Sequence, residues 1–368
     1  MKQTTQGFVL IDVDVASLNN AGENTTSNFN NSVATKKIFK DKKAYVYVSG
    51  QAWRYWWRDT LQKQFGWELS PIIRGKKIAF TEANPYKYND DDIFGYMKAT
   101  KDVEKDEENN SIKDKKGQEK TKDATVTRIS PLKNSALISV TPVNTAENWS
   151  SMSRQEGDAV PFTREEYSAI LKGMFSIDIN QVGTFSDYNK SGYKNITEKL
   201  KKEILENDGI EINDNFLNDE NGNPKKLVQI GKVERVKRIT DTISALKFIS
   251  GGAMQTTNMA DVTPKLVILA TFSTSNHPFS HVAGMGKLNN FEFKIDALKE
   301  VLLEYNSKLI SNIYIGIRNG FLDEMKSEIE KMRDELNNLD GFKNFKIIFN
   351  SVNEAIDSYC EELKNLIK

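Results

Sequence analysis

"SGQAWRYWWRDTL" (residues 49–61) decides where the first helix of this chain packs, because three tryptophans and two arginines fall within six positions. At about 100° of rotation per residue, an apolar arc runs along one side of a helix over residues 50–65. The arc consists of Trp53, Trp56, Trp57, Thr60, Leu61 and Phe65. The segment therefore predicts a helix that begins near residue 50, with Ser49 as its cap and with tryptophans that mostly belong to the core.

The same helix has a polar edge that suits an anion. Arg54 and Arg58 are four residues apart beside Gln51, so their stems can pack while their charged heads reach solvent or a ligand. Ser49 and Gly50 leave the first backbone N–H groups accessible, and such a helix N-terminus binds phosphate well. The alternative is that both arginines pair with acidic neighbours on a surface helix, and the segment alone leaves both interpretations open.

Composition narrows the classes of function. Lys and Arg total 51, and Asp and Glu total 51, so a basic surface has to come from local clustering. Cys360 is the only cysteine, which excludes an intrachain disulfide and a thiolate zinc site. No apolar run is long enough to span a membrane, and Asp12 and Asp14 interrupt the apolar N-terminal stretch. We therefore expect a cytoplasmic protein without a membrane partner.

The order of apolar and polar segments predicts one domain of mixed helices and strands. Alternation over residues 7–16 predicts a first strand, and residues 17–31 form a long polar loop. Apolar residues spaced three and four apart predict amphipathic helices over 322–339 and 352–366. Further strands are expected in "ATVTRIS" (124–130), "NSALISVTPV" (134–143), "GMFSIDINQVGTF" (173–185), "PKLVILATF" (264–272), "NIYIGIRNG" (312–320) and "FKIIFN" (345–350).

Two polar segments are typical of insertions into this domain, which we take to cover residues 1–368. Residues 98–124 are nearly free of apolar side chains and mix both charges, which predicts a mobile charged insertion. Residues 186–226 are also polar, and "NDENGNPKK" (218–226) is a strong turn signal, so a protruding arm or hairpin is expected there.

Two other segments are candidates for ligand contact. Gly251 and Gly252, in "FISGGAMQTTNMADVTPKLVILA" (248–270), follow a strand-like run and permit another chain to approach the backbone, although a turn without a ligand fits equally well. Arg154 and Gln155, in "SMSRQEGDAVPF" (151–162), could clamp a phosphate, or Arg154 could pair with Glu156 to stabilise the loop.

Seven segments agree, in chain order from about residue 8 to 272, with one known family. They are "IDVDVASLNNAG" (11–22), "NNSVATKKI" (30–38), "YVSGQAWRYWWRDTLQKQFGWELSPI" (47–72), "TEANPYKYNDDDIFGYM" (81–97), "SPLKNSALISV" (130–140), "SRQEGDAVPF" (153–162) and "ISGGAMQTTNMADVTPKLVILA" (249–270). Together they resemble the DevR family, the repeated backbone subunit of type I-B CRISPR surveillance complexes called Cascade.

The resemblance implies an α+β fold. Its palm is expected to be RRM-like (ferredoxin-like), with an antiparallel sheet elaborated by finger and thumb insertions, and the arm at 186–226 is a possible thumb. Copies of the chain would form a helical filament along one CRISPR RNA, each thumb displacing a base, so that the guide is displayed for pairing with target DNA in antiviral defence. Other Cascade subunits and a recruited nuclease-helicase are the further partners, and no cofactor or metal is expected.

The resemblance also suggests which residues contact RNA. Trp53 and Trp57 would pack the helix against the palm, while the helix start and the arginines grip phosphates. We expect the RNA-binding set to be Asn19, Asn20, Ser49, Gly50, Gln51, Arg54, Arg58, Arg154, Gln155, Gly251, Gly252, Met254 and Gln255.

Catalysis is not expected of this chain. Relatives that cleave RNA use an aspartate in the loop after the first strand, whereas residues 17–32 here contain Glu23 and no aspartate. The competing hypothesis is a metal-dependent ribonuclease that uses Asp12, Asp14 or Glu23, and Asp90–Asp92 could add metal ligands if the fold brought them close. A third hypothesis is a regulatory protein that carries no guide RNA.

Overall fold

The computed structural model describes residues 2–25, 27–28, 31–75, 78–99, 101–103, 121–123, 125–152, 156–190, 192–339, 342 and 344–367. Most of the predicted charged insertion at 98–124 lies outside these residues, as do Arg154 and Gln155. The chain divides into two compact units. Unit 1 comprises Met1–Phe65, Lys133–Asp178 and Thr240–Leu366, and unit 2 comprises Gly66–Leu132, Ile179–Ile239 and Ile367–Lys368.

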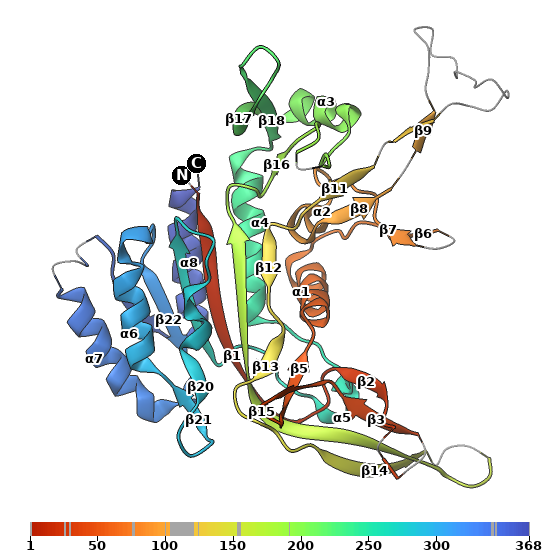
Figure 1. The fold of residues 1–368 in the computed structure, drawn as a ribbon, viewed down its shortest axis with the longest axis vertical. Coiled ribbons are helices and arrows are strands. Elements are labelled where there is room, and N and C mark those ends of the chain that lie inside the picture. Colours follow the sequence, from red (N-terminus) through yellow and green to blue (C-terminus); the bar gives the residue numbers. More distant parts are fainter. Residues whose placement is uncertain are drawn as a thin grey trace. The chain divides into compact units, whose positions relative to one another are not determined.

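Unit 1 is built on a large, mostly antiparallel sheet, so the predicted mixed α+β class is confirmed (Figure 1). The strand order is β23-β22-β19-β1-β15-β13-β5-β4. These strands are β1 (Thr4–Ala16), β4 (Lys37–Lys40), β5 (Lys43–Val48), β13 (Leu137–Ser139), β15 (Val160–Asp178), β19 (Leu266–Phe272), β22 (Ile313–Ile317) and β23 (Ile347–Asn350). Only the β22–β23 pair along this path is parallel.

Shorter strands extend the sheet or form hairpins. β2 (Asn20–Glu23) and β3 (Ser32–Thr35) lie within and beside the predicted first loop, and β14 (Ala146–Met152) pairs with the first half of β15. The remaining short strands are β6 (Ile73–Arg74), β7 (Ala79–Phe80), β8 (Tyr96–Lys98), β9 (Lys101–Val103), β10 (Thr121–Asp123), β11 (Val126–Arg128), β12 (Leu132–Asn134), β16 (Thr184–Phe185), β20 (Ala283–Met285) and β21 (Phe291–Phe293).

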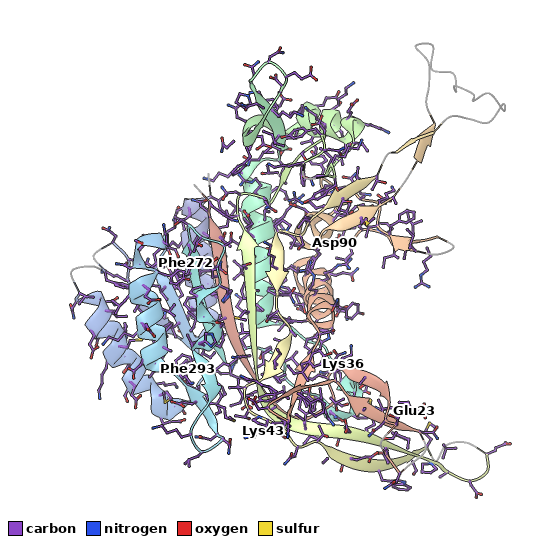
Figure 2. The ribbon with its side chains drawn as sticks, viewed as in Figure 1. Glu23, Lys36, Lys43, Asp90, Phe272 and Phe293 are labelled. Carbon is purple, nitrogen blue, oxygen red and sulfur yellow. The ribbon has the colours of Figure 1, made fainter. Side chains whose placement is uncertain are left out.

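Helices cover both faces of the central strands of unit 1. On one face, α1 (Gly50–Phe65) packs Trp57 against Phe175, and α8 (Val352–Leu366) places Tyr359 over Thr5 and Thr271. On the other face, Phe8 and Leu10 join a core cluster with residues of α6 (Ile295–Glu304) and α7 (Lys326–Asn337). Phe272 and Phe293, labelled in Figure 2, belong to that cluster. The amphipathic C-terminal helices predicted from apolar spacing are therefore confirmed as α7 and α8.

Unit 2 contains α2 (Asn89–Phe94), α3 (Glu198–Asn207) and the hairpin of β17 (Ile210–Asn218) and β18 (Pro224–Gln229) (Figure 1). The predicted turn is confirmed, because the Asp219 carboxylate accepts hydrogen bonds from the backbone N–H groups of Asn221 and Asn223 at its tip. The polar composition did not predict α3, which buries Leu200 and Ile204 in a small core with Phe185 and Val228.

Two helices remain. α4 (Lys232–Ser244) continues into a 3-10 turn at Ala245–Lys247, and α5 (Gln255–Asn258) is a single turn within the glycine-rich segment. The strand-like run expected just before Gly251 is therefore wrong, because the helical segment extends to Lys247. Within the described residues, none of the helices has the length and apolar character needed to cross a bilayer.

Candidate nucleic-acid interface

The N-terminus of α1 is fixed by two neighbouring polar groups. Ser49 Oγ accepts a hydrogen bond from the Ala52 backbone N–H at 3.3 Å, which confirms Ser49 as the cap. The backbone N–H of Ser49 itself donates to Asn19 Oδ1 at 2.8 Å. The first loop and the start of the helix are thus joined directly, and both belong to unit 1.

The tryptophans of α1 form the core, as its periodicity predicted. Trp53 and Trp57 are fully buried and stack with ring centroids 5.4 Å apart. The indole N–H of Trp57 donates to the Thr242 carbonyl at 2.6 Å, so its one polar atom is satisfied. Trp56 is also buried. Because these rings fix the rotation of α1, the edge that carries the arginines has a set orientation.

The two arginines of α1 share a partly desolvated position. Arg54 Nη1 donates to Asn134 Oδ1 at 3.1 Å, and both arginine side chains are half-buried. Burial, and to a smaller extent the positive charge of Arg58, lowers the pKa of Arg54 to about 10. The two guanidinium groups carry like charges close enough to interact, and a phosphate between them would be attracted to both.

Asn134 is a residue that sequence reasoning missed. Its Nδ2 donates to the Gly50 carbonyl at 3.1 Å, while its Oδ1 accepts from Arg54. A Cβ at Gly50 would lie 3.2 Å from Asn134 Nδ2, so glycine lets this side chain sit against the start of the helix. Asn134 lies in "SPLKNSALISV" (130–140), one of the segments that carry the family resemblance.

The glycine-rich segment packs onto the first loop and α1. The Ala253 N–H donates to the Leu18 carbonyl at 3.0 Å. Gly252 has a φ of 106°, and a Cβ there would lie 2.6 Å from Leu18 Cδ2. A Cβ at Gly251 would overlap the Trp56 ring. The glycine-rich segment therefore packs on the first loop and on the middle of α1, although it lies far from both in the sequence, and only glycine permits this packing.

The remaining candidates of this segment differ in what their side chains do. Gln255 Nε2 donates to the carbonyls of Gly251 and Ala260, so its amino group holds the loop closed. Met254 adopts a left-handed φ of 63° and is half-buried. In the first loop and helix, Asn20 and Gln51 are exposed.

A metal centre has no support among the residues that the structure describes, where no group of three or more His, Cys, Asp or Glu side chains is placed to hold an ion. Asp92 of unit 2 accepts instead from Arg128 Nη2 at 2.6 Å and from Arg238 Nη1 at 2.8 Å. In unit 1, desolvation and the neighbouring Asp14 raise the pKa of Asp12.

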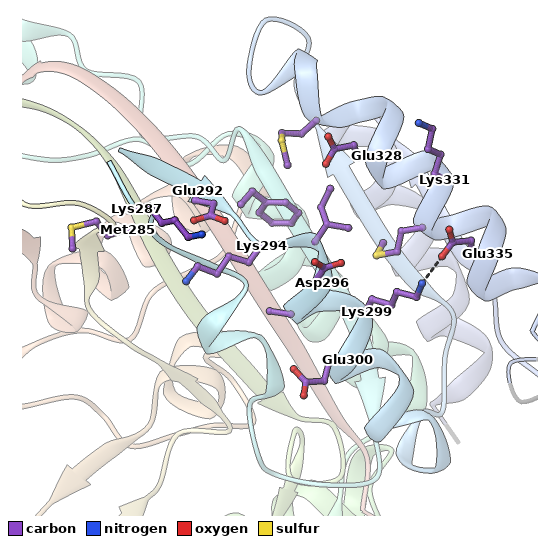
Figure 3. Close-up of a pocket in the computed structure, with 16 residues that line it drawn as sticks. Met285, Lys287, Glu292, Lys294, Asp296, Lys299, Glu300, Glu328, Lys331 and Glu335 are labelled. Carbon is purple, nitrogen blue, oxygen red and sulfur yellow. Dashed lines mark hydrogen bonds and ion pairs between the residues drawn. The ribbon is translucent and has the colours of Figure 1, made fainter. Parts of the chain in front are cut away.

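A separate cavity of about 1010 Å³ lies among the β20–β21 hairpin, α6 and α7 (Figure 3). Four lysines and five acidic residues line it, and Lys299 pairs with Glu335 across it. A phosphate chain in this cavity would meet carboxylates as often as amines. We therefore do not include it in the candidate interface.

Comparison with known proteins gives one family and a shared fold. The family model described as "CRISPR-associated negative auto-regulator DevR/Csa2" matches residues 9–291. No curated protein sequence matches the chain. A solved chain titled "CRISPR RNA-guided surveillance complex, pre-nicking" has a TM-score of 0.53 at 9% identity, with 98% of this chain and 99% of that chain covered. Another, titled "CRISPR RNA-guided surveillance complex", has a TM-score of 0.49 at 7% identity and the same coverage.

Proposed function

The chain belongs to the CRISPR-associated DevR/Csa2 family, as its sequence motifs predicted, and on that premise we propose that it is a CRISPR RNA-binding backbone subunit. Copies of it line up along one guide RNA in a type I-B Cascade complex and display the guide for pairing with target DNA. Guide–target pairing supplies the sequence specificity, so the protein needs only to recognise the RNA backbone and its shape.

The observation that carries this proposal is the convergence at the N-terminus of α1. Asn19 of the first loop accepts from the Ser49 N–H at the helix start, and the glycine-rich segment at Gly251–Gly252 packs on that loop and on α1. Arg54 and Arg58 lie half-buried on the same helix. Backbone N–H groups at a helix start and paired guanidinium groups are the two kinds of group that bind phosphate best. Asn20, Gln51 and Met254 complete the proposed contact set, with Gln255 shaping the loop and Arg154 and Gln155 as further contacts.

An RRM-like palm within a single elaborated domain is part of the proposal. In chain order β1, α1, β13, β15, α4 and β19 follow the β-α-β-β-α-β sequence of ferredoxin-like folds. Their order in the sheet, β19-β1-β15-β13, is the order that such a palm requires. On this view the segments of unit 2 are the insertions, and the arm at 186–226 with its β17–β18 hairpin supplies the thumb.

We further propose that the chain does not cleave RNA, and that a recruited nuclease-helicase cuts the target. Glu23 is exposed on β2 and Asp14 is exposed on β1, which leaves them without the enclosed, water-excluding setting that favours catalysis. Incubation of the pure protein with Mg²⁺ or Mn²⁺ and guide or target RNA should leave both RNAs intact. Cleavage that is lost in Asp12→Asn or Glu23→Gln would establish the ribonuclease alternative instead.

Purification with and without a CRISPR RNA tests the proposed function. We expect co-expression with the RNA to give a large complex with excess absorbance at 260 nm, and expression without it to give a small, RNA-free species or one loaded with other RNA. A monomer that carries no RNA under either condition would contradict the proposal and favour a regulatory protein without a guide.

A further inference from the structure

One face of the β4–β5 ribbon carries three lysines, two tyrosines and one isoleucine. Directly paired residues of neighbouring strands point to the same side of a sheet. Lys40 pairs with Lys43 and Ile38 pairs with Tyr45. The next pair along the ribbon brings Tyr47 beside Lys36, whose carbonyl accepts from the Tyr47 N–H at 3.0 Å. We call this set the β4–β5 face; it consists of Lys36, Ile38, Lys40, Lys43, Tyr45 and Tyr47.

This face continues across the sheet to another lysine. Tyr47 pairs with Ile138 of β13, and Ile138 pairs with Lys172 of β15, so all three side chains point the same way. Lys172 donates to the carbonyls of Ser280 and Ala283 at 3.1 and 3.0 Å, which fixes its amine beside the β20–β21 hairpin. Lys36 and Lys43 are labelled in Figure 2.

Except near the turn, where Phe39 is 74% exposed, the opposite side of the same ribbon is occupied. Val46 and Val48 are fully buried, and Lys37 forms an ion pair with Glu165 there at 2.5 Å. On the β4–β5 face, Lys40 and Lys43 are exposed and Ile38 is 40% exposed. Within the described residues, the lysines of this face form no ion pair, although Lys43 Nζ donates to Asn289 Oδ1 at 3.0 Å.

Two features of the ribbon lower its stability. Like charges directly opposite each other, as at Lys40 and Lys43, destabilise a strand pair. The turn between them places Asp41 and Lys42 at φ values of 50° and 62°, a left-handed conformation that glycine or asparagine would adopt more easily. Burial lowers the pKa of Lys172, and repulsion by Lys40 and by Lys294 lowers it further. Features that work against stability are concentrated at functional surfaces.

We propose that the β4–β5 face binds the backbone of a single-stranded nucleic acid, with its lysines on phosphates and its two tyrosines against bases. A basic strip with interspersed aromatic rings is the arrangement that binds single strands without reading their sequence. The face points away from the side of the sheet that α1 covers, so it is a second surface and not part of the candidate interface. This inference rests on the proposed function and adds a strand-binding surface to it.

The guide RNA and the single strands of target DNA share this chemistry, so the test uses both. Fluorescence anisotropy measures binding of a 20-nucleotide RNA, a DNA of the same sequence and the corresponding DNA duplex across a salt series. The variant K36Q/K40Q/K43Q removes the lysines of the ribbon. The matched control K331Q/K346Q/K364Q removes three exposed lysines from α7, from the residue before β23 and from α8. Ultraviolet cross-linking with peptide mapping locates the contact.

We expect K36Q/K40Q/K43Q to bind single strands at least about tenfold more weakly and to lower the salt slope by about 2, at roughly 0.7 per lost phosphate contact. The control should match the wild type, and cross-links should map to Tyr45 or Tyr47. The strand with the larger loss, RNA or DNA, identifies the natural ligand.

An unchanged salt slope in a folded K36Q/K40Q/K43Q protein, or cross-links only outside residues 36–47, would overturn the inference. Equal losses for duplex and single strands would overturn the single-strand preference, and altered self-association with unaltered nucleic-acid binding would assign the face to a second copy of the chain. The variant R54A/R58A separates this inference from the proposed function. If R54A/R58A keeps full RNA affinity, the α1 interface fails independently of the β4–β5 face.

Discussion

At the scale of single residues, some side chains of α1 stabilise the fold and others are placed to contact a ligand. Trp57 is fully buried, stacks on Trp53 and donates to the Thr242 carbonyl, whereas Arg54 and Arg58 lie half-buried beside each other. Arg54 is a cation that the fold keeps in a position where desolvation and a like charge disfavour it. Such a cation contributes little to the free energy of unfolding, and an anion that binds beside it would stabilise its charge.

Substitutions in α1 should therefore separate RNA affinity from stability. We expect R54A/R58A to weaken RNA binding by roughly tenfold or more, since a hydrogen bond to a charged group contributes about 1.5–3 kcal/mol, while the melting temperature changes little. Trp57→Ala should destabilise the fold by about 3–5 kcal/mol through the cavity that it leaves. Thermal melting and anisotropy measure the two effects. If R54A/R58A lowered the melting temperature as much as Trp57→Ala does, the arginines would have a structural role.

The two histidines of the chain offer a matched pair for a pH test. His277 bonds through Nε2 to the Gly7 carbonyl at 2.9 Å, and burial lowers its pKa, whereas His281 is exposed. Below about pH 6.5 the imidazole of His277 therefore binds a proton more readily in the unfolded chain than in the folded protein. The free energy of unfolding is unaffected by this group above that pH and decreases as the pH falls.

We expect the melting temperature of the wild type to drop between pH 7.5 and pH 5.5 by more than that of His277→Gln, whose side chain cannot titrate. His281→Gln should show the same drop as the wild type. Thermal melts at both pH values provide the measurement, and identical drops in all three proteins would exclude His277 as a contributor.

At the scale of elements, unit 2 is held by a buried cluster of ions. Asp92 on α2 is fully buried and accepts from Arg128 of β11, from Arg238 of α4 and from the Gly183 N–H at 2.8 Å. Burying three charges costs desolvation free energy, which the hydrogen bonds among them offset. Loss of the central carboxylate would leave two buried guanidinium groups without their acidic partner.

Asp92→Asn should therefore destabilise unit 2 by about 3–5 kcal/mol. The control is Asp187→Asn, which removes a partly exposed ion pair with Lys201 at 3.3 Å and should cost less than about 1 kcal/mol. Denaturant unfolding combined with hydrogen exchange of residues 89–94 measures both. Similar protection in Asp92→Asn and the wild type would mean that the cluster does not hold the unit together.

Two hairpins are candidates for the thumb. The β17–β18 hairpin in the predicted arm carries Phe216, which is 84% exposed with Lys190 Nζ 5.3 Å from its ring centre. The β14–β15 hairpin of unit 1 carries Trp149, which is 62% exposed. Exposed aromatic rings on a projecting hairpin can wedge between bases.

We expect Phe216→Ala to reduce the regular displacement of RNA bases in assembled complexes and Trp149→Ala to leave it intact. Chemical probing of base reactivity along the bound RNA detects displaced bases at single-nucleotide resolution. The opposite result would assign the thumb to β14–β15.

The elements that sequence predicted best are those whose burial follows a local pattern. Alternation located β1, β-branched and aromatic residues between turn signals located β19, and helical spacing of apolar residues located α1 and α8. β14 escaped detection because all seven of its residues are exposed, so no alternation marks it. The candidate site was harder to predict than the elements. The glycines of "SGG" indicate that another part of the chain comes close to the backbone, but only tertiary packing shows that Trp56 and Leu18, about 200 residues away, are the residues that do so. The basic face of β4 and β5 was missed because its pattern emerges only from the pairing register.

At the scale of the whole molecule, net charge and the proposed function have to be reconciled. The chain has a formal net charge of zero, which gives a single copy little long-range attraction for RNA. Local clusters, at α1 and on the β4–β5 face, give each copy a few phosphate contacts. When neighbouring copies share one RNA, those contacts combine and the affinity of the assembly exceeds that of any copy.

This reasoning predicts that binding depends on RNA length. On RNAs of increasing length, the number of bound copies should rise in proportion to length, and the apparent affinity should rise with it. Each added phosphate contact should steepen the plot of log affinity against log salt by about 0.7. Native mass spectrometry counts the copies, and anisotropy over a salt series gives the slopes. R54A/R58A is the control, because it should need longer RNAs to assemble. A single copy on every RNA, with a salt slope independent of length, would contradict the backbone role, since a subunit that binds alone gains nothing from a longer guide.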